Sequence, residues 1–193
     1  MISHDNITYV VRHLGELVKL KHFHERIISY LPLSHIAAQA LDLFCPLAFG
    51  ITVYFAQPDA LKGSLNKTMQ EVRPTFFFGV PRVFEKIQEN IEKVTSTLTG
   101  LKLKIYLWSR RVSSENVLAN FNGLNSNSAS FKLAKKLIVD ANFKKLGLDQ
   151  CRYFYSGAAP ITKETLDFFH GLGIPLCEVL KRFVKFLEKT FSY

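Results

Sequence analysis

Three short segments carry residues that could bind or activate a ligand. Residues 31–35 (L-P-L-S-H) end in His35, residues 79–82 (G-V-P-R) end in Arg82, and residues 156–160 read S-G-A-A-P. A histidine can orient a carboxylate, close an apolar pocket or carry a proton near neutral pH. An arginine can pair with an anion through two parallel hydrogen bonds. The small residues of 156–160 would let a flat ligand such as a purine press against the backbone.

Each of these segments also has a purely structural interpretation. His35 could be an ordinary half-buried histidine, since histidine is often intermediate in burial. Arg82 could form a salt bridge with Glu85, three residues further along a helix. Residues 156–160 could be a strand-to-helix turn in which small side chains serve packing. The residues alone leave both interpretations open at all three places.

Other known catalytic and metal-binding patterns are missing from the sequence. No pair of histidines at helical spacing encloses a glutamate, and His13, His22 and His24 have no cysteine nearby, so we predict no metal site. There is also no G-x-S-x-G, no complete phosphate loop and no G-x-G-x-x-G. No single motif therefore establishes an enzyme.

Strands and helices alternate along the chain. We expect strands at 26–31, 51–56, 75–80, 151–156 and 174–179, and helices at 5–21, 34–48, 60–72, from 81 onward, 101–118, 131–146 and 162–170. Asp5 and Thr162 are the expected N-caps of two of these helices, and Pro81 opens a third. The helix at 34–48 is largely apolar, so we expect it to be buried.

This alternation predicts an α/β fold with a mostly parallel sheet and helices on both faces. The strands are apolar throughout, as is typical of sheets covered on both sides. Such sheets bind ligands beyond the carboxyl ends of their strands. We therefore expect His35, Arg82 and Gly157 to lie along one edge of the sheet.

The amino-acid composition excludes several classes of protein. With 193 residues, 48% hydrophobic and 21% charged, the chain is long and apolar enough for an ordinary globular domain and excludes global disorder. Its net charge of +9 suits an anionic partner, but no nucleic-acid recognition motif is present, so we predict no nucleic-acid binding. The apolar run 36–56 contains Asp42 and Pro46, which favours a buried helix and strand over a membrane span.

Taken together, the three segments resemble one family. The strings L-P-L-S-H-I-A-A-Q (31–39), Y-F-A-Q-P-D-A-L-K-G-S-L (54–65), P-T-F-F-F-G-V-P-R-V-F-E-K-I (74–87) and S-G-A-A-P-I (156–161) are similar to the adenylate-forming superfamily. Within it they look most like the long-chain acyl-CoA synthetases of the bubblegum type. The resemblance runs from about residue 1 to residue 178. It implies a partial AMP-binding domain over 1–178, belonging to the N-terminal domain of an adenylate-forming enzyme.

The resemblance also implies an activity and roles for individual residues. Members use ATP and Mg²⁺ to convert a long-chain fatty acid into an acyl-adenylate, and coenzyme A then displaces AMP. The backbone of Gly157, Ala158 and Ala159 would form one wall of the adenine slot, and Ser156 and Pro160 would set that turn. The catalytic residue would be His35, near the carboxylate and the acyl pocket. Val80, Pro81 and Arg82 would lie near the acyl channel.

The two ends of the sequence depart from the family pattern. No Ser/Thr/Gly-rich phosphate loop ending in lysine precedes M-I-S-H-D-N-I-T (1–8), and V-L-K-R-F (179–183) stands where a Tyr-Gly-x-Ser/Thr-Glu motif would follow Glu178. We therefore expect an internal fragment, arising from a truncated gene model or a splice product and inactive alone. The alternative is a non-catalytic protein that binds lipid, a membrane surface or a full-length homologue.

Residues 179–193 form a divergent tail. Its apolar residues alternate with four basic ones, Lys181, Arg182, Lys185 and Lys189, a pattern typical of helices that lie on anionic membranes. Unselected sequence is the competing interpretation.

With three cysteines and no signal peptide, we expect free thiols in the cytoplasm, and peripheral contact with the endoplasmic reticulum or another membrane stays open.

Overall fold

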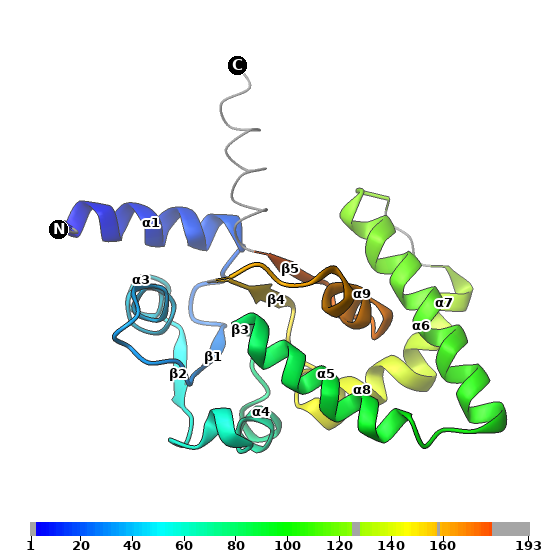
Figure 1. The fold of residues 1–193 in the computed structure, drawn as a ribbon. Coiled ribbons are helices and arrows are strands. Elements are labelled where there is room, and N and C mark those ends of the chain that lie inside the picture. Colours follow the sequence, from blue (N-terminus) through cyan, green and yellow to red (C-terminus); the bar gives the residue numbers. More distant parts are fainter. Residues whose placement is uncertain (1–2, 125–127, 158, 179–193) are drawn as a thin grey trace. The chain divides into compact units, whose positions relative to one another are not determined.

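The structure, a computed structural model, describes residues 3–124, 128–157 and 159–178 (Figure 1). The helices are α1 His4–Leu17, α2 Ile36–Gln39, α3 Cys45–Phe49, α4 Leu65–Val72, α5 Pro81–Thr95, α6 Gly100–Phe121, α7 Ala129–Ala134, α8 Asp140–Leu146 and α9 Lys163–Gly171. The strands are β1 Arg26–Ser29, β2 Thr52–Phe55, β3 Phe76–Gly79, β4 Tyr153–Ser156 and β5 Leu176–Glu178. Two π-helical turns, Ala40–Phe44 and Lys135–Val139, lie between helices, and one 3₁₀ turn, Ala60–Lys62, lies between β2 and α4.

The described residues fall into two compact units. The first contains residues 3–77 and 146–153, and the second contains residues 78–145 and 154–178 apart from the undescribed positions. Strands β3 and β4 pass from the first unit into the second.

Helix α1 of the first unit begins one residue earlier than the sequence pattern indicated. Ser3 is its N-cap, because the backbone N–H of Asn6 donates to Ser3 Oγ at 3.2 Å. The backbone N–H of Ser3 donates in turn to Asn6 Oδ1 at 3.0 Å, which completes a capping box. Asp5 lies inside the first turn, so the prediction that it caps the helix was wrong.

Strands β1 and β2 of the first unit are parallel, with Arg26 opposite Thr52 and Ser29 opposite Phe55. The helical segment that connects them is continuous from 36 to 49, and its buried residues, among those whose burial the structure describes, form one stripe of Ala38, Leu41 and Cys45. This stripe faces α1, which packs on the π-helical turn and on α3. The other side is open, and Leu47 is 77% exposed. The prediction of a buried helix was therefore wrong for half of its circumference.

Strand β2 is also more open than its composition indicated. Tyr54 is exposed and Phe55 is 73% exposed, although an apolar strand predicts coverage on both faces. Strands β1, β3 and β4 fit that expectation, since most of their side chains are buried. Among the described residues, β2 has β1 as its hydrogen-bonded neighbour, which leaves its apolar side chains at an edge.

The predicted helix at 60–72 is divided in two. Gly63 follows the 3₁₀ turn with φ +146°, a conformation that glycine adopts without strain, and α4 starts only at Leu65. Helix α4 ends at Arg73, whose guanidinium forms a bidentate ion pair with Asp149. This pair ties the end of α4 to the segment that leads into β4.

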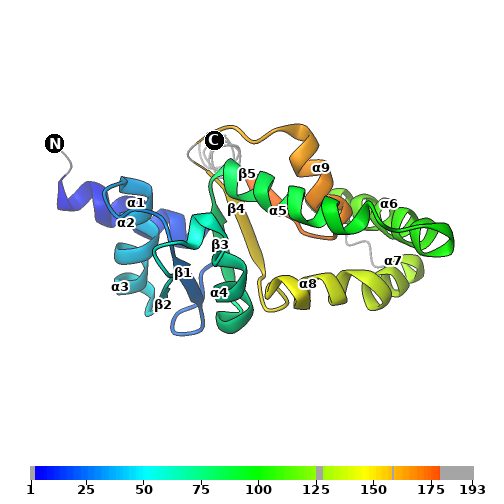
Figure 2. The same cartoon turned by 60° about the horizontal axis from the view of Figure 1, so that its bottom comes forward.

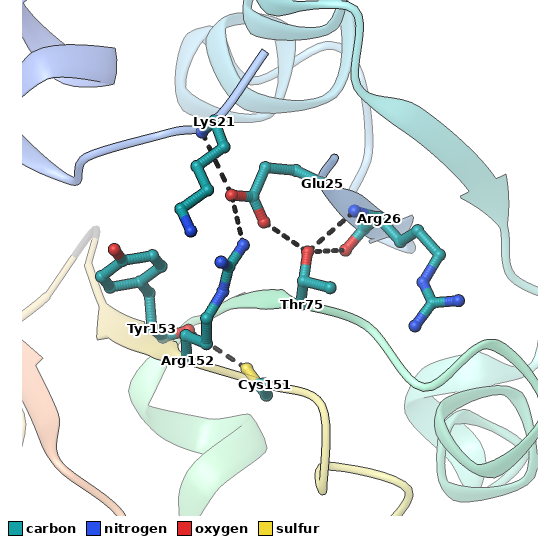
Figure 3. A network of polar contacts seen from close by, with 7 residues as sticks. All are labelled: Lys21, Glu25, Arg26, Thr75, Cys151, Arg152 and Tyr153. Atoms are coloured by element: carbon teal, nitrogen blue, oxygen red, sulfur yellow. Dashed lines mark hydrogen bonds and ion pairs between the residues drawn. The ribbon is translucent and has the colours of Figure 1, made fainter. Parts of the chain in front are cut away.

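A buried carboxylate joins the beginnings of three strands in the first unit (Figure 3). The side chain of Glu25, fully buried, accepts hydrogen bonds from Arg152 Nη2 at 2.6 Å, Thr75 Oγ1 at 2.5 Å and the backbone N–H of Lys21 at 3.1 Å. Glu25 precedes β1, Thr75 precedes β3 and Arg152 precedes β4.

Backbone hydrogen bonds join the same three segments. The N–H of Thr75 donates to the carbonyl of Arg26 at 3.0 Å, and the N–H of Arg152 donates to the carbonyl of Thr75 at 2.9 Å. The amino ends of β1, β3 and β4 are therefore fixed to one another by side-chain and main-chain contacts together.

The second unit contains the sheet in the order β3-β4-β5, with β4 and β5 parallel and Ser156 opposite Glu178. Thr162 caps α9 as predicted, since the N–H of Thr165 donates to its Oγ1 at 3.2 Å. Pro81 occupies the first turn of α5, also as predicted. Helix α9 packs on α6, where the guanidinium of Arg110 lies 4.7 Å from the centre of the Phe168 ring.

The α/β class and the parallel strands predicted from the sequence are confirmed. None of the helices that the structure describes is long and apolar enough to cross a membrane. The run 36–56, the candidate for such a span, consists of the helical segment 36–49 followed by strand β2, in agreement with the predicted helix and strand. The predicted boundary between a domain over 1–178 and a tail stays a prediction, since residues 179–193 lie outside the described part of the chain.

Candidate functional site

The loop 156–160 leaves the carboxyl end of β4 and is held against β3. The N–H of Gly157 donates to the carbonyl of Gly79, the last residue of β3, at 3.2 Å. At the other end of the same two strands, Arg152 donates to Thr75. One of these hydrogen bonds joins the beginnings of the two strands and the other joins their ends. Strands β3 and β4 are therefore parallel. The loop and the segment 80–82 therefore start from the same edge of the sheet.

The far end of the loop is held by β5. The carboxylate of Glu178, the last residue of β5, accepts a hydrogen bond from the N–H of Ile161 at 3.0 Å. Ser156 and Ile161 are buried, whereas Ala159 and Pro160 are exposed. Ala158 lies outside the described residues. The loop is thus fixed at both ends by neighbouring strands and presents small residues outward between them.

Ser156, the last residue of β4, has a polar atom without a visible partner. Its side chain is 1% exposed, and its Oγ makes no hydrogen bond within the part of the chain that the structure describes. Buried hydroxyl groups are normally paired, so an orphaned one at a strand end is typical of a site that another group completes. That Ser156 borders a binding site stays a prediction.

In the segment 80–82, the first two residues are buried or half-buried and the third is exposed. Val80 is half-buried and Pro81 is buried, whereas the side chain of Arg82 is 91% exposed. Arg82 Nη1 lies 2.9 Å from Glu85 Oε2, so the salt bridge that the sequence offered as an alternative is formed. Exposed pairs of this kind contribute about 0–1 kcal/mol and would not prevent Arg82 from moving to an anion.

His35 belongs to the first unit and is described with that unit only. It is exposed and lies in the bend just before α2, where its N–H donates to the carbonyl of Pro32 at 3.1 Å. The sequence correctly placed it at the start of a helix. That His35 shares an edge with Arg82 and Gly157 stays a prediction.

Asp42 is a candidate that sequence reasoning missed. It lies in the π-helical turn of the first unit, where burial raises the pKa of its carboxyl to about 6, against the opposing effect of a hydrogen bond from Ser29. Burial and the charge of Asp42 also raise the pKa of the Cys45 thiol to about 12, and that of the Tyr30 hydroxyl well above its usual range. Desolvated acids of this kind concentrate at functional sites.

The sequence did contain a signal for Asp42. It is the one acidic residue of the apolar run 36–56. Within that run, the charge of Asp42 indicated at the level of sequence only that the segment does not span a membrane. Its contact with Ser29, at the carboxyl end of β1, depends on the fold and could not be inferred from spacing.

The described residues contain no group of three or more histidine, cysteine, aspartate or glutamate side chains that could hold a metal ion. The donor set therefore does not fit Mg²⁺ within this part of the chain. The three cysteines are free thiols, with Cys45 and Cys151 buried and Cys177 half-buried.

Comparison with known proteins gives concordant matches. Residues 1–181 match the family described as AMP-binding enzyme. The long-chain-fatty-acid–CoA ligase ACSBG2 of Xenopus laevis is 47% identical over 182 residues, which cover 93% of this chain and 25% of that protein. The ACSBG2 of Homo sapiens is 44% identical over 183 residues, covering 93% of this chain and 27% of the relative.

A solved structure agrees at the level of fold. The adenylation domain of a carboxylate reductase from Mycobacterium chelonae superposes with a TM-score of 0.54 at 20% identity, covering 86% of this chain and 22% of that one. The resemblance to the long-chain acyl-CoA synthetases is therefore confirmed by independent comparisons of sequence, and the fold by one of structure. The chain spans about a quarter of the length of the curated relatives it matches.

Proposed function

The chain belongs to the AMP-binding enzyme family, and from this premise we propose that it supplies part of the nucleotide and acyl site of an ATP-dependent long-chain fatty acid–CoA ligase. The proposal takes its substrate class from relatives that carry that name. The substrates would be ATP, a long-chain fatty acid and coenzyme A. The free thiols of the chain support a cytoplasmic location as part of the same proposal.

One observation carries the proposal. The loop 156–160 is held at Gly157 by the carbonyl of Gly79 and at Ile161 by the carboxylate of Glu178. A loop fixed at both ends presents its backbone and small side chains at little entropic cost, which suits a flat purine ring. Exposed Ala159 and Pro160 would form the wall against which adenine lies, and the orphaned Ser156 hydroxyl would border it.

The reaction proceeds in two displacements. The fatty-acid carboxylate attacks the α-phosphorus of ATP, a P–O bond to pyrophosphate breaks, and an acyl-adenylate forms. The thiolate of coenzyme A then attacks the acyl carbonyl, and AMP leaves. In this scheme the loop 156–160 orients the adenosine, His35 orients the carboxylate, and Val80 and Pro81 border the acyl channel. No step is assigned to Mg²⁺ because the described residues offer it no ligand set.

A second candidate function is non-catalytic binding of a lipid, a membrane or a homologous chain. Large apolar side chains at the surface of the first unit favour it, among them Leu47 at 77% and Phe55 at 73% exposed. Exposed apolar surface of this kind marks interaction sites. The two candidates differ in whether adenosine nucleotide binds at all.

Binding of AMP to the full 193-residue chain tests the proposal. Replacing Ala159 by leucine should fill the space for adenine and weaken binding by about 1–3 kcal/mol, the usual cost of forcing methylenes into a filled site. Replacing Ala48 by leucine provides the control, because Ala48 is equally exposed but lies on α3. Calorimetry should show loss of AMP binding for the first variant only.

Two outcomes would contradict the assignment of the loop 156–160 to the nucleotide site. Equal AMP affinity for the Ala159→Leu variant and the unaltered protein would remove the loop from the nucleotide site. If the unaltered chain binds no AMP, the same substitution in a full-length relative decides the matter through ATP–pyrophosphate exchange. Unchanged exchange there would refute the role of the loop.

A further inference from the structure

Helix α6 in the second unit buries polar residues together with apolar ones. Ser109, Ser113 and Asn116 are each 4% exposed or less, beside buried Tyr106 and Val117. Helices that border a core normally bury apolar residues and expose polar ones. On α6, several large apolar side chains lie on the exposed side instead.

The exposed side of α6 is a continuous apolar and basic stripe. Residues at alternating spacings of three and four lie along one line of a helix. The line on α6 is Leu101, Lys104, Trp108, Arg111, Glu115 and Leu118, with Leu107 beside it. Leu101 is 72%, Leu107 is 54% and Trp108 is 37% exposed. We refer to Leu101, Lys104, Leu107, Trp108, Arg111 and Leu118 as the α6 outer face.

The charge of this region is strongly positive. Residues 100–145 contain nine lysines and arginines against two aspartates and glutamates, a formal charge of +7 out of +9 for the whole chain. The acid on the line, Glu115, is paired with Arg111 at 3.0 Å. The basic groups on the outer face are therefore not balanced by a free acid on the same line.

The start of α6 is also accessible. All five residues from Leu101 to Ile105 are exposed, and Val94, close to the end of α5, is 68% exposed. In Figures 1 and 2 the short connection between α5 and α6 lies at one end of the unit, away from the sheet strands. The apolar side chains at this end have no covering element within the part of the unit that is described.

We propose that the α6 outer face binds an anionic lipid surface, with its apolar side chains inserted at the headgroup level and Lys104 and Arg111 on the lipid phosphates. Exposed tryptophan and leucine side chains can insert at the headgroup level, while neighbouring lysine and arginine contact the phosphates of anionic lipids. Tryptophan favours that depth because its ring is apolar and its N–H is polar. The proposal is independent of nucleotide binding and of the proposed ligase activity.

The chemistry of the face favours lipid over a protein partner. Lysine is depleted in protein–protein interfaces, whereas it strengthens adsorption to anionic membranes. An apolar protein surface placed here would have to bury Lys104 and Arg111 between Leu101, Trp108 and Leu118 without a described counter-charge beyond Glu115. A lipid headgroup layer supplies those counter-charges and remains hydrated.

Trp108 is the single tryptophan of the chain, so tryptophan fluorescence reports the environment of the α6 outer face. The full chain is mixed with vesicles of phosphatidylcholine alone or with phosphatidylserine added, and the emission of Trp108 is recorded. With phosphatidylserine we expect a blue shift, protection from acrylamide and quenching by brominated lipid. The effect should weaken as salt is raised, because screening shortens the range of the attraction.

A double variant with a matched control shows whether binding depends on the basic residues of the α6 outer face or only on the net positive charge of the chain. Lys104→Gln with Arg111→Gln should lower partitioning about 25-fold, taking about five-fold for each basic group near an anionic surface. Arg12→Gln with Lys67→Gln makes the same charge change on the first unit. Like Arg111, both control residues are exposed and pair with a glutamate four positions on. This control should partition as the unaltered protein does.

Five results would overturn the proposal. The first three are an absent blue shift with phosphatidylserine, an equal shift with phosphatidylcholine, and an equal loss in the two double variants. The fourth is cosedimentation with vesicles while Trp108 stays open to acrylamide, which would assign binding to another segment such as 179–193. A blue shift that appears with protein concentration in the absence of vesicles, together with a dimer by light scattering, would instead assign the face to a second copy of the chain.

Discussion

Replacing Arg152 by methionine should destabilise the first unit by about 3–5 kcal/mol, the usual cost of leaving one member of a buried ion pair without its partner. The free-energy cost is this large because the two members of the ion pair differ in burial. The side chain of Glu25 is 0% exposed, whereas that of Arg152 is 38% exposed. Without Arg152, the carboxylate would keep only two neutral donors, Thr75 Oγ1 and the N–H of Lys21.

A second substitution should partly reverse the damage. Glutamine in place of Glu25 has nearly the same shape and carries no charge, so it needs no cation in the interior. The double variant Glu25→Gln with Arg152→Met should therefore be more stable than Arg152→Met alone. Arg12→Met is the control, since Arg12 is 80% exposed and its pair with Glu16 should be worth less than about 1 kcal/mol.

Urea unfolding followed by circular dichroism measures these differences, and amide hydrogen exchange locates them. Loss of protection should concentrate at the beginnings of β1, β3 and β4, where the contacts of Glu25, Thr75 and Arg152 lie. A cost below about 1 kcal/mol for Arg152→Met, the value of a surface pair, would show that the carboxylate does not hold the strands together. Equal stability of the single and double variants would refute the electrostatic explanation.

Two further predictions concern pH and activity. Burial gives Asp42 a pKa of about 6 in the folded chain against an ordinary value of 3.8, so the folded state retains the proton longer than the unfolded one. The free energy of unfolding should therefore fall as pH rises from about 4 to about 6 and stay level above, by about 1–2 kcal/mol after allowance for partial exposure. Thermal melts of Asp42→Asn should lack this fall, and an identical pH profile would refute it. The 193-residue chain alone should give no ATP–pyrophosphate exchange, because its sequence has no Ser/Thr/Gly-rich loop ending in lysine for the phosphates. Exchange above background that is lost on altering His35 would contradict this.

The sequence by itself determined the local structure and the family. Thr162 and Pro81 were recognised as helix starts because capping and the fixed φ of proline act within one turn of the chain. The strand at 75–80 and the loop 156–160 were recognised for the same reason, since each depends on a short run of residue types. Asp5 and Ser3 are both good capping residues, and Ser3 is the N-cap because its N–H also donates to Asn6 Oδ1, so the prediction of Asp5 was wrong.

Tertiary structure decided burial and pairing. Leu47 and Phe55 have the residue types of a core but are exposed, because the elements that could cover them are not among their neighbours in the described chain. The pairing of Glu25 with Arg152 joins residues 127 positions apart, which no periodicity can indicate. Which side of α6 is buried depends on which side meets α9, and the sequence leaves that open because both sides mix apolar and polar residues. Local geometry is set by forces within a few residues, whereas exposure and charge pairing are set by contacts that exist only once distant segments have packed.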